Sequence, residues 1–364
     1  MLRQKQQTAR ARRLDFRPPR LELDAELEWV LQRALGPLTW KPSARVSGQR
    51  LVDVALRLDL AARIAARHPS ELVEREMGAP SATRLREQYV ATVAREALLE
   101  HALIQLLEHA HTANLPCVLL KYSALNRLGV LRVGSRVASD IDVLVPHAHA
   151  RRFQAFLKEK GYRDCALPES SHQLPALQDP NGVLIELHIH VPVVALALGA
   201  PFVSADALLA AGLTVRSGEA LLPTPAILAA HAVAHGLMQH AHVPHVYSPL
   251  KTFADLADLE LAIPGVLAQA TPYLSAMAAE DQANVQVLAR ALSAGDLTLA
   301  MSGDPGKILR HALASQLDRS YAIRLRLWGL MRSKPTSVRR TPAQLVAALR
   351  AAWHWARSTP PNAH

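Results

Sequence analysis

Apolar residues follow two different periods along this chain, and the change between them predicts its organisation. From Leu21 to about Ala113 they recur every three or four residues, as in LEWVLQRAL, LVDVALRLDLAARIAA and the stretch from Arg84 to Leu107, which is the spacing of amphipathic helices. After Pro192 the same spacing returns in PAILAAHAVAHGLMQH and PLKTFADLADLELA. We therefore expect helical layers on both sides of a central region of different character.

The central region between these helical blocks is predicted to contain strands. CVLLKY, directly after Pro116, has the composition of a short buried strand, and the helical stretch SALNRLGVL follows it. SDIDVLVP predicts a strand that ends at Pro146, and HARRFQAFLKEKG predicts a helix that ends at Gly161. The turn DPNG leads into VLIELHIHV, the clearest strand, whereas YRDCAL and HQLPAL are weaker candidates. A strand-rich centre between helical blocks predicts an α+β fold.

The length of the chain predicts more than one structural unit. A chain of 364 residues exceeds what a single hydrophobic core usually serves, so we expect a catalytic core with helical additions. In chain order we expect a basic N-terminal segment, a helical region, the catalytic core, a second helical region and a basic tail, at residues 1–20, 21–113, 114–200, 201–330 and 331–364.

Positive charge is concentrated at the two ends of the chain. The formal net charge is +10, of which residues 1–20 carry +6 and residues 301–364 carry +9, so that residues 21–300 carry −5. Basic ends attract phosphate backbones through a salt-dependent interaction, which predicts RNA or another polyanion as a partner; the alternative is that both ends are simply solvated. The tail VRRTPAQLVAALRAAWHWAR forms either an amphipathic membrane-binding face or a packed helix, which we favour.

Cysteine content and hydropathy predict a cytoplasmic protein. Cys117 and Cys165 are too few for a disulfide framework and lack metal-ligand spacing. The first thirty residues contain no apolar core of signal-peptide length, and no apolar run approaches the roughly 20 residues that a transmembrane helix needs. We therefore expect no transmembrane segment.

Asp140 and Asp142 are the first candidates for chemistry. Alternate side chains of a strand share a face, so the two carboxylates project together while Ile141, Val143 and Val145 point into the core. Two close carboxylates raise each other's pKa unless a cation neutralises them, and hard oxygen ligands select Mg²⁺ or Mn²⁺. The pair therefore predicts a divalent metal site.

A second polar stripe lies on the strand VLIELHIHV. Alternation places Glu186, His188 and His190 on one face of this strand. If the strand lies beside Asp140 and Asp142, Glu186 supplies a third carboxylate to the same ions. The two histidines would then orient a ligand, position a phosphate or form hydrogen bonds behind the metal ligands. The alternative for all three side chains is an ordinary core or surface role.

Zinc is the competing metal, because the chain has 17 histidines, and His188 and His190 on their strand would bind it together with a third ligand. His231 and His235 lie four residues apart on one helical face, but no Glu lies beside His231 as a helical HExxH site requires. We therefore expect His231, His235 and His240 to pack in the protein or to face a substrate. The motifs GxxxxGK[ST], GxGxxG and GxSxG do not occur in the sequence, so P-loop, dinucleotide-binding and serine-hydrolase functions lack support.

Together these residues resemble a known family. The run LLKYSALNRLGVLRVGSRVASDIDVLV, a helix, His172 and then VLIELHIHV are similar to the uncharacterised nucleotidyltransferase family of the DNA polymerase β superfamily. The family pattern is a Leu-Lys-Gly start, an Arg shortly before an Asp-Ile-Asp-Leu-Leu-Val strand, and a later Glu-Leu-His strand. The similarity is strongest over residues 115–192 and continues through LLPTPAILAAHAVAH and FADLADL.

The resemblance implies a fold and a site. The fold is a polymerase β-like core, a small mixed sheet flanked by helices, with helical additions at both ends. The catalytic, metal-binding carboxylates are Asp140, Asp142 and Glu186. The residues expected to contact the nucleoside triphosphate, for example ATP, are Lys121, Ser123, Arg136 and Ser139. The residues expected behind the metal ligands or beside the substrate are His172, His188 and His190.

The implied reaction is metal-dependent transfer of a nucleoside monophosphate, with release of pyrophosphate. RNA, proteins and small molecules all stay open as acceptors, and the basic ends favour RNA. One position departs from the family pattern, because Tyr122 stands where the family has the glycine after the lysine. A glycine permits close approach of the backbone to a phosphate, which a Tyr side chain would obstruct. The second hypothesis is therefore a nucleotide- or partner-binding protein with a degenerate site.

Overall fold

The computed structural model is an α+β structure, as the sequence predicts. It describes residues 13–42, 46–165, 172–192, 194, 196, 202–240, 248–318 and 320–325. The predicted basic segment at residues 1–20 is therefore described only from residue 13 onward. The predicted tail at residues 331–364 lies outside the described residues.

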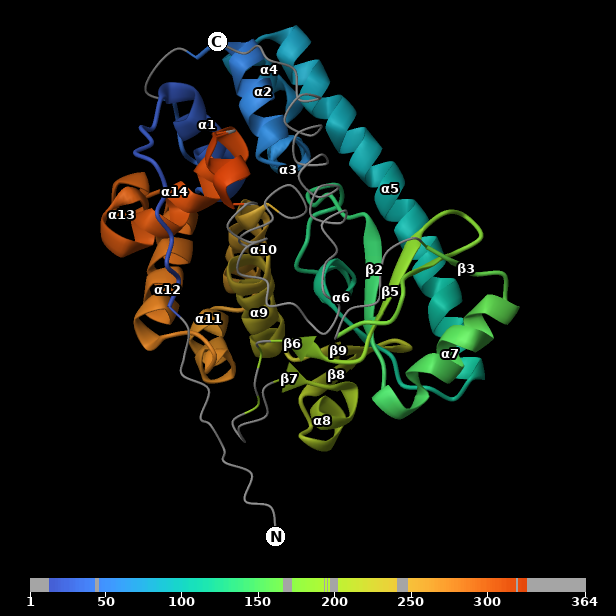
Figure 1. The fold of residues 1–364 in the computed structure, drawn as a ribbon. Coiled ribbons are helices and arrows are strands. Elements are labelled where there is room, and N and C mark those ends of the chain that lie inside the picture. Colours follow the sequence, from blue (N-terminus) through green and yellow to red (C-terminus); the bar gives the residue numbers. More distant parts are fainter. Residues whose placement is uncertain are drawn as a thin grey trace, which may run out of the picture.

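Helices α1 to α5 form the N-terminal layer. They are α1 (Ala25–Leu35), α2 (Gly48–Arg57), α3 (Ala61–Arg67), α4 (Ser70–Met77) and α5 (Ala79–Thr112). Asp24 caps α1, because its side chain accepts a hydrogen bond from the backbone N–H of Leu27 at 2.8 Å. The long helix α5 begins after Gly78, whose φ of 85° suits glycine, and it runs past the sheet to the neighbourhood of α7 (Figure 1).

A seven-stranded mixed sheet forms the centre of the structure. Its order is β3-β4-β5-β2-β1-β9-β8. The strands and the helices between them are β1 (Val118–Leu119), α6 (Lys121–Arg127), β2 (Asp140–Leu144), α7 (His147–Glu159), β3 (Arg163–Asp164), β4 (Leu177–Gln178), β5 (Leu184–His188), β8 (Thr214–Ser217) and β9 (Ala220–Pro223). β2 is antiparallel to β1 and parallel to β5.

The predicted strand VLIELHIHV is shorter in the structure than in the sequence prediction. β5 ends at His188, and the chain then leaves the large sheet to form β6 (Val191–Pro192), which pairs with β7 (Phe202–Val203) in a second sheet. His190 therefore lies beyond the end of β5, so the strand predicted over VLIELHIHV was too long. The alternation of residue types in the sequence continues past the end of the strand.

The two faces of the large sheet have different environments. Ile141 and Val143 of β2 and Ile185 and Leu187 of β5 belong to a buried apolar cluster shared with α5 and α7. Asp142 alternates with Ile141 and Val143 and therefore projects from the opposite face. Alternation along these two strands thus separates a dry core from a polar face on which the candidate site lies.

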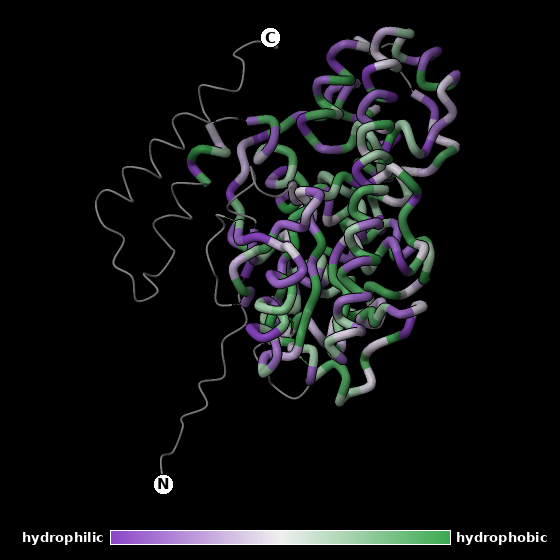
Figure 2. The backbone as a smooth tube through the Cα atoms, turned by 90° about the vertical axis from the view of Figure 1, so that its right-hand side faces the viewer, coloured by the Kyte–Doolittle hydropathy of each residue, from purple (hydrophilic) through white to green (hydrophobic). Residues whose placement is uncertain are grey.

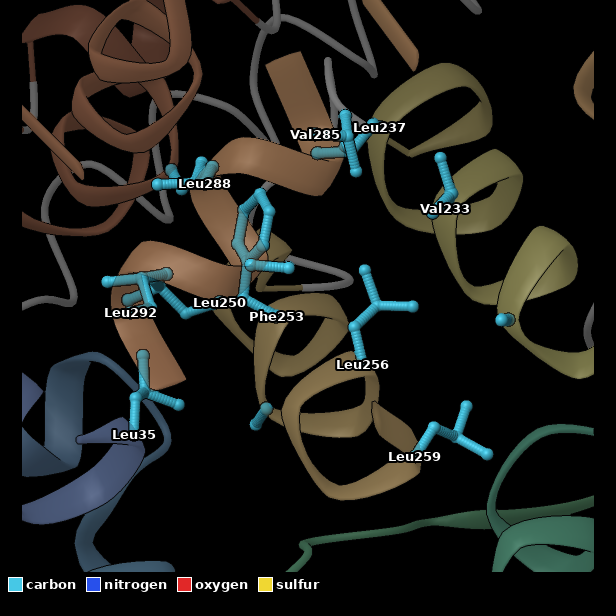
Figure 3. Close-up of a cluster of buried hydrophobic side chains, with 14 of the residues drawn as sticks. Leu35, Val233, Leu237, Leu250, Phe253, Leu256, Leu259, Val285, Leu288 and Leu292 are labelled. Atoms are coloured by element: carbon cyan, nitrogen blue, oxygen red, sulfur yellow. The ribbon is translucent and has the colours of Figure 1, made fainter. Parts of the chain in front are cut away.

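The remaining helices follow in the chain, and α9 packs against α6 and β9. They are α8 (Ala205–Ala210), α9 (Pro225–Val233), a π-helical turn η1 (Ala234–Gln239), α10 (Pro249–Ala262), α11 (Val266–Ala270), a 3₁₀ turn η2 (Thr271–Leu274), α12 (Ala279–Ala294), α13 (Leu297–Met301) and α14 (Gly303–Leu317). Figure 3 shows Phe253 of α10 among leucines of α10 and α12, with Val233 and Leu237 from α9 and η1 nearby. In Figure 2, apolar and polar positions alternate along the helical coils, as amphipathic helices require. None of the described helices is both long and apolar enough to cross a bilayer.

Candidate active site

The pairing of β2 with β5 brings the predicted carboxylates together. Asp142 lies directly opposite Glu186 in the parallel register. The Nε2 atom of His188 lies 2.8 Å from Oδ1 of Asp142 and 3.5 Å from Oε2 of Glu186. Within the described part of the chain, these three residues are the group whose ligand atoms all lie within 4.8 Å of one another. Two carboxylates and one imidazole therefore converge on one point.

Asp140 lies beside this group but outside it. It begins β2, and its Oδ1 atom accepts a hydrogen bond from Oγ of Ser139 at 3.2 Å. Burial raises the pKa of the Asp140 carboxyl, and the neighbouring anions Asp142 and Glu186 raise it further, while Lys121 lowers it. The surroundings of Asp140 therefore disfavour its ionised form.

Lys121 balances part of this negative charge. It begins α6 with a φ of 46°, an uncommon conformation for a residue with a side chain, and its Nζ atom lies 2.7 Å from Oδ1 of Asp142. Burial alone lowers the pKa of Lys121, but the attraction of Asp142, Asp140 and Glu186 outweighs it and raises the pKa. Burial raises the pKa of Asp142, whereas Lys121 and His188 together hold it well below its usual range.

Arg136 and the loop before β2 are held by buried contacts. Nε of Arg136 donates a hydrogen bond to Oδ1 of Asp255 at 2.7 Å, and its Nη2 donates one to Oδ2 at 3.0 Å. This bidentate ion pair attaches the loop to α10. The backbone N–H of Gly134 donates to Glu96 of α5 at 2.7 Å. The loop that leads to Asp140 is thereby attached to helices on two sides.

Tyr122 takes part in the same set of contacts. Its side chain is only 5% exposed and belongs to the apolar cluster beneath the sheet. The Arg136 guanidinium lies 5.8 Å from the centre of the ring, and the phenol forms a hydrogen bond with Glu96. The residue that replaces the family glycine is therefore largely withdrawn into the core.

A cavity of about 400 Å³ opens over the carboxylates. On the sheet side its lining contains most of the predicted residues, namely Lys121, Arg136, Ser139, Asp140, Asp142, His172, Glu186 and His188. Ser123 and His190, which the sequence also suggested, are not among the described residues that line it. Ser123 is buried within α6, and His190 lies past the end of β5, where its ring is 6.4 Å from that of His172.

The opposite wall of the cavity comes from α9, η1 and α10. It consists of His231, His235, Gln239, His240 and Lys251. The two walls touch where Nε2 of Gln239 meets Nε2 of His172 at 3.2 Å. The spacing of His231 and His235 was visible in the sequence, whereas Gln239 and Lys251 carried no signal there. The π-helical turn η1 changes the helical register between His235 and Gln239, a feature that often occurs at functional sites.

The buried histidines of this wall are neutral at pH 7. Burial, followed by repulsion from Lys121, lowers the pKa of His231 to about 3 and that of His240 to about 4. The same two causes lower the pKa of His235 well below its ordinary value. The wall formed by α9, η1 and α10 therefore presents neutral imidazoles together with the ammonium of Lys251.

The buried histidines predict a stability that falls on acidification. Below pH 6.5 these rings are protonated in the unfolded chain, but in the folded protein they stay neutral down to about pH 3 to 4. Each ring therefore lowers the free energy of unfolding by about 1.4 kcal/mol for each pH unit of acidification in this range. We expect His231→Gln to reduce the difference in urea stability between pH 6.5 and pH 5 by about 2 kcal/mol. His101→Gln, at an exposed position of α5, is the matched control and should leave the difference unchanged. An equal pH dependence in wild type and His231→Gln would contradict the expectation.

Comparison with known proteins decides the family. The model of the uncharacterised nucleotidyltransferase family matches residues 45–270, a range that contains the sheet, the cavity and both of its walls. The chain belongs to this family. The family prediction made from the sequence is therefore confirmed, and the chain is an enzyme of the nucleotidyltransferase class.

More distant similarities add little. The solution structure of the antibiotic-resistance factor ANT(2'')-Ia is 19% identical, with a TM-score of 0.35, over 50% of this chain and 92% of that one. The crystal structure of ANT(2'')-Ia with adenylyl-2''-tobramycin has the same identity and TM-score over 48% of this chain and 96% of that one. We draw no substrate from similarities of this degree. No curated protein matches the chain.

Proposed function

We propose that this family member transfers a nucleoside monophosphate from a nucleoside triphosphate to an acceptor hydroxyl and releases pyrophosphate. The observation that carries the proposal is the register that sets Asp142 opposite Glu186 on the floor of the cavity. Nucleotidyl transfer needs the charge of a triphosphate to be neutralised and its reacting phosphorus to be positioned. Carboxylates alone would repel the triphosphate, so the proposal requires divalent cations between the two.

The side chains on the floor fit such a cation. Carboxylate oxygens of Asp142 and Glu186 converge with a ring nitrogen within 4.8 Å, and Asp140 lies beside them. These donors suit Mg²⁺ or Mn²⁺. A bound divalent ion would polarise the reacting phosphorus and stabilise the charge of the departing pyrophosphate.

The other cavity residues divide into two roles. Lys121 and Arg136 bring positive charge to the same side as the carboxylates, where the phosphates would lie. His231, His235 and His240 offer hydrogen bonds from neutral rings, which suits an uncharged part of the acceptor or the nucleoside, and Lys251 on the same wall is paired with Asp59 at 3.1 Å. The nucleotide and the acceptor would therefore enter from chemically different sides.

The acceptor can be found by labelling. The protein is incubated with each α-labelled nucleoside triphosphate, Mg²⁺ or Mn²⁺ and a host lysate, and the labelled product is isolated. We expect one product to carry the label and to disappear when Asp142→Asn replaces the wild type. Loss of the label on ribonuclease treatment would identify RNA, the acceptor favoured by the basic ends. Absence of any labelled product with all four nucleotides and both ions would contradict the proposal.

The competing hypothesis is a degenerate site, motivated by Tyr122. Its side chain lines the cavity, but it is only 5% exposed, and its ring is held by Glu96 and Arg136. This observation favours an active site. A degenerate protein would bind the nucleotide and release no pyrophosphate, which the same incubations detect.

A further inference from the structure

A ring nitrogen lies between two carboxylates on the floor of the cavity. His188 is the last residue of β5, its side chain is 5% exposed, and its Nε2 atom points between Asp142 and Glu186. We infer that His188 is itself a ligand of the cation held by Asp142 and Glu186, so that the site prefers a first-row transition-metal dication to Mg²⁺. The inference rests on the proposed function only for the presence of a cation at this point.

The distances between the three side chains suit coordination. Neighbouring ligands of an octahedral ion with bonds of roughly 2.1 Å lie roughly 3 Å apart. The Nε2 atom of His188 lies 2.8 Å from the Asp142 oxygen and 3.5 Å from the Glu186 oxygen, on either side of that value. A cation among the three atoms would take the place of the contacts that Lys121 and His188 now make with Oδ1 of Asp142.

Asp140 is the weaker candidate for the third position at this ion. Its carboxylate accepts the Ser139 hydroxyl and lies outside the group that shares the 4.8 Å limit. It lies on the same cavity wall, where a second ion or the nucleotide would be close to it. The geometry thus divides the polar residues into one mixed nitrogen and oxygen site and one neighbouring carboxylate.

The ligand set has a consequence for metal choice. Mg²⁺ is bound almost entirely by oxygen and gains little from an imidazole, whereas transition-metal dications accept nitrogen readily. If His188 only held the two carboxylates in place by hydrogen bonding, the ion would meet oxygen alone and the preference would not depend on this residue. The two roles can therefore be separated by measuring ion binding.

The test uses Mn²⁺ as the probe and the full chain without nucleotide. Electron spin echo modulation of bound Mn²⁺ detects a directly coordinated ring nitrogen. We expect this ¹⁴N signal in wild type and in His190→Gln, the matched control from the end of the same segment, and its loss in His188→Gln. Mn²⁺ affinity should fall at least about tenfold in His188→Gln. His188→Asp, which restores a ligand but makes it oxygen, should keep binding and shift the Mn²⁺ to Mg²⁺ preference toward Mg²⁺ by a similar factor.

A ¹⁴N signal and a Mn²⁺ preference that both survive His188→Gln in a folded protein would overturn the inference and leave His188 a positioning residue. Since no turnover is measured, this result would not affect the proposed function. Conversely, a protein that binds Mn²⁺ through His188 but transfers no nucleotide would keep the inference and end the proposal of nucleotidyl transfer.

Discussion

Asp142→Asn is expected to lower metal-dependent nucleotidyl transfer by about 10³-fold or more. The substitution keeps the shape of the side chain and removes its charge. Asp142 is 3% exposed, and its Oδ1 atom lies within hydrogen-bonding distance of both the Lys121 ammonium and the His188 ring nitrogen. Among the described residues of the sheet, Asp142 is the carboxylate that lies directly opposite Glu186. The measurement is pyrophosphate release at saturating nucleotide and ion.

Two controls separate lost chemistry from lost folding. Asp164→Asn removes an exposed carboxylate of β3 that pairs with Lys158 and should leave the rate unchanged. Asp142→Asn also leaves Lys121 buried with one partner fewer, which costs stability. The double variant Lys121→Met/Asp142→Asn removes both charges of the pair, so it should recover part of the stability without recovering turnover. A folded Asp142→Asn protein with a rate within threefold of wild type would show that Asp142 is not in the active site.

Asp255→Ala is expected to lower the free energy of unfolding by about 3 to 5 kcal/mol, because it leaves the Arg136 guanidinium buried without its carboxylate. The side chains of Arg136 and Asp255 are 10% and 4% exposed, and two hydrogen bonds join them. One turn later on α10, Asp258 makes a similar bidentate pair with Arg63 of α3. α10 therefore ties the loop before β2 to the N-terminal helices, and urea denaturation measures what this connection contributes.

The matched control is again the exposed pair of Lys158 and Asp164. Asp164→Ala should produce no measurable loss of stability, since solvent screens both charges. The double variant Arg136→Met/Asp255→Leu replaces the buried pair by apolar side chains and should restore most of the stability. Equal urea midpoints for wild type and Asp255→Ala would contradict the expected contribution of the Arg136–Asp255 pair to stability. Turnover of the stable double variant would show whether Arg136 also contacts phosphate, as the family resemblance implies.

Local periodicity in the sequence predicted the parts of the site that depend on one element. Alternation placed Asp140 and Asp142 on the polar side of a buried strand, and it placed Glu186 and His188 together on another. It did not indicate the end of β5, because the alternation of residue types continues to His190 after the strand has ended at His188. The roles of these residues in metal and nucleotide binding stay predictions.

Contacts between side chains that lie far apart in the chain could not be predicted from the sequence. Arg136 meets Asp255 across 119 positions, and His172 meets Gln239 across 67. Nothing in the spacing of either residue indicates its partner, because such contacts follow from how helices pack on the sheet. The π-helical turn η1 was not predicted either. The wall that contains the neutral histidines became apparent only in the folded chain. The sequence therefore predicted the floor of the cavity better than its opposite wall.

The most direct test of the account follows the phosphates of the nucleotide. Parallel reactions contain the same triphosphate, labelled at the α-phosphorus in one and at the γ-phosphorus in the other. Each also contains the acceptor identified in the lysate experiment, in its unmodified form. The account predicts that the α-label appears on the acceptor and the γ-label in pyrophosphate, in equal amounts. A γ-label on the acceptor with release of the nucleoside diphosphate, or nucleotide binding with no pyrophosphate at all, would contradict it.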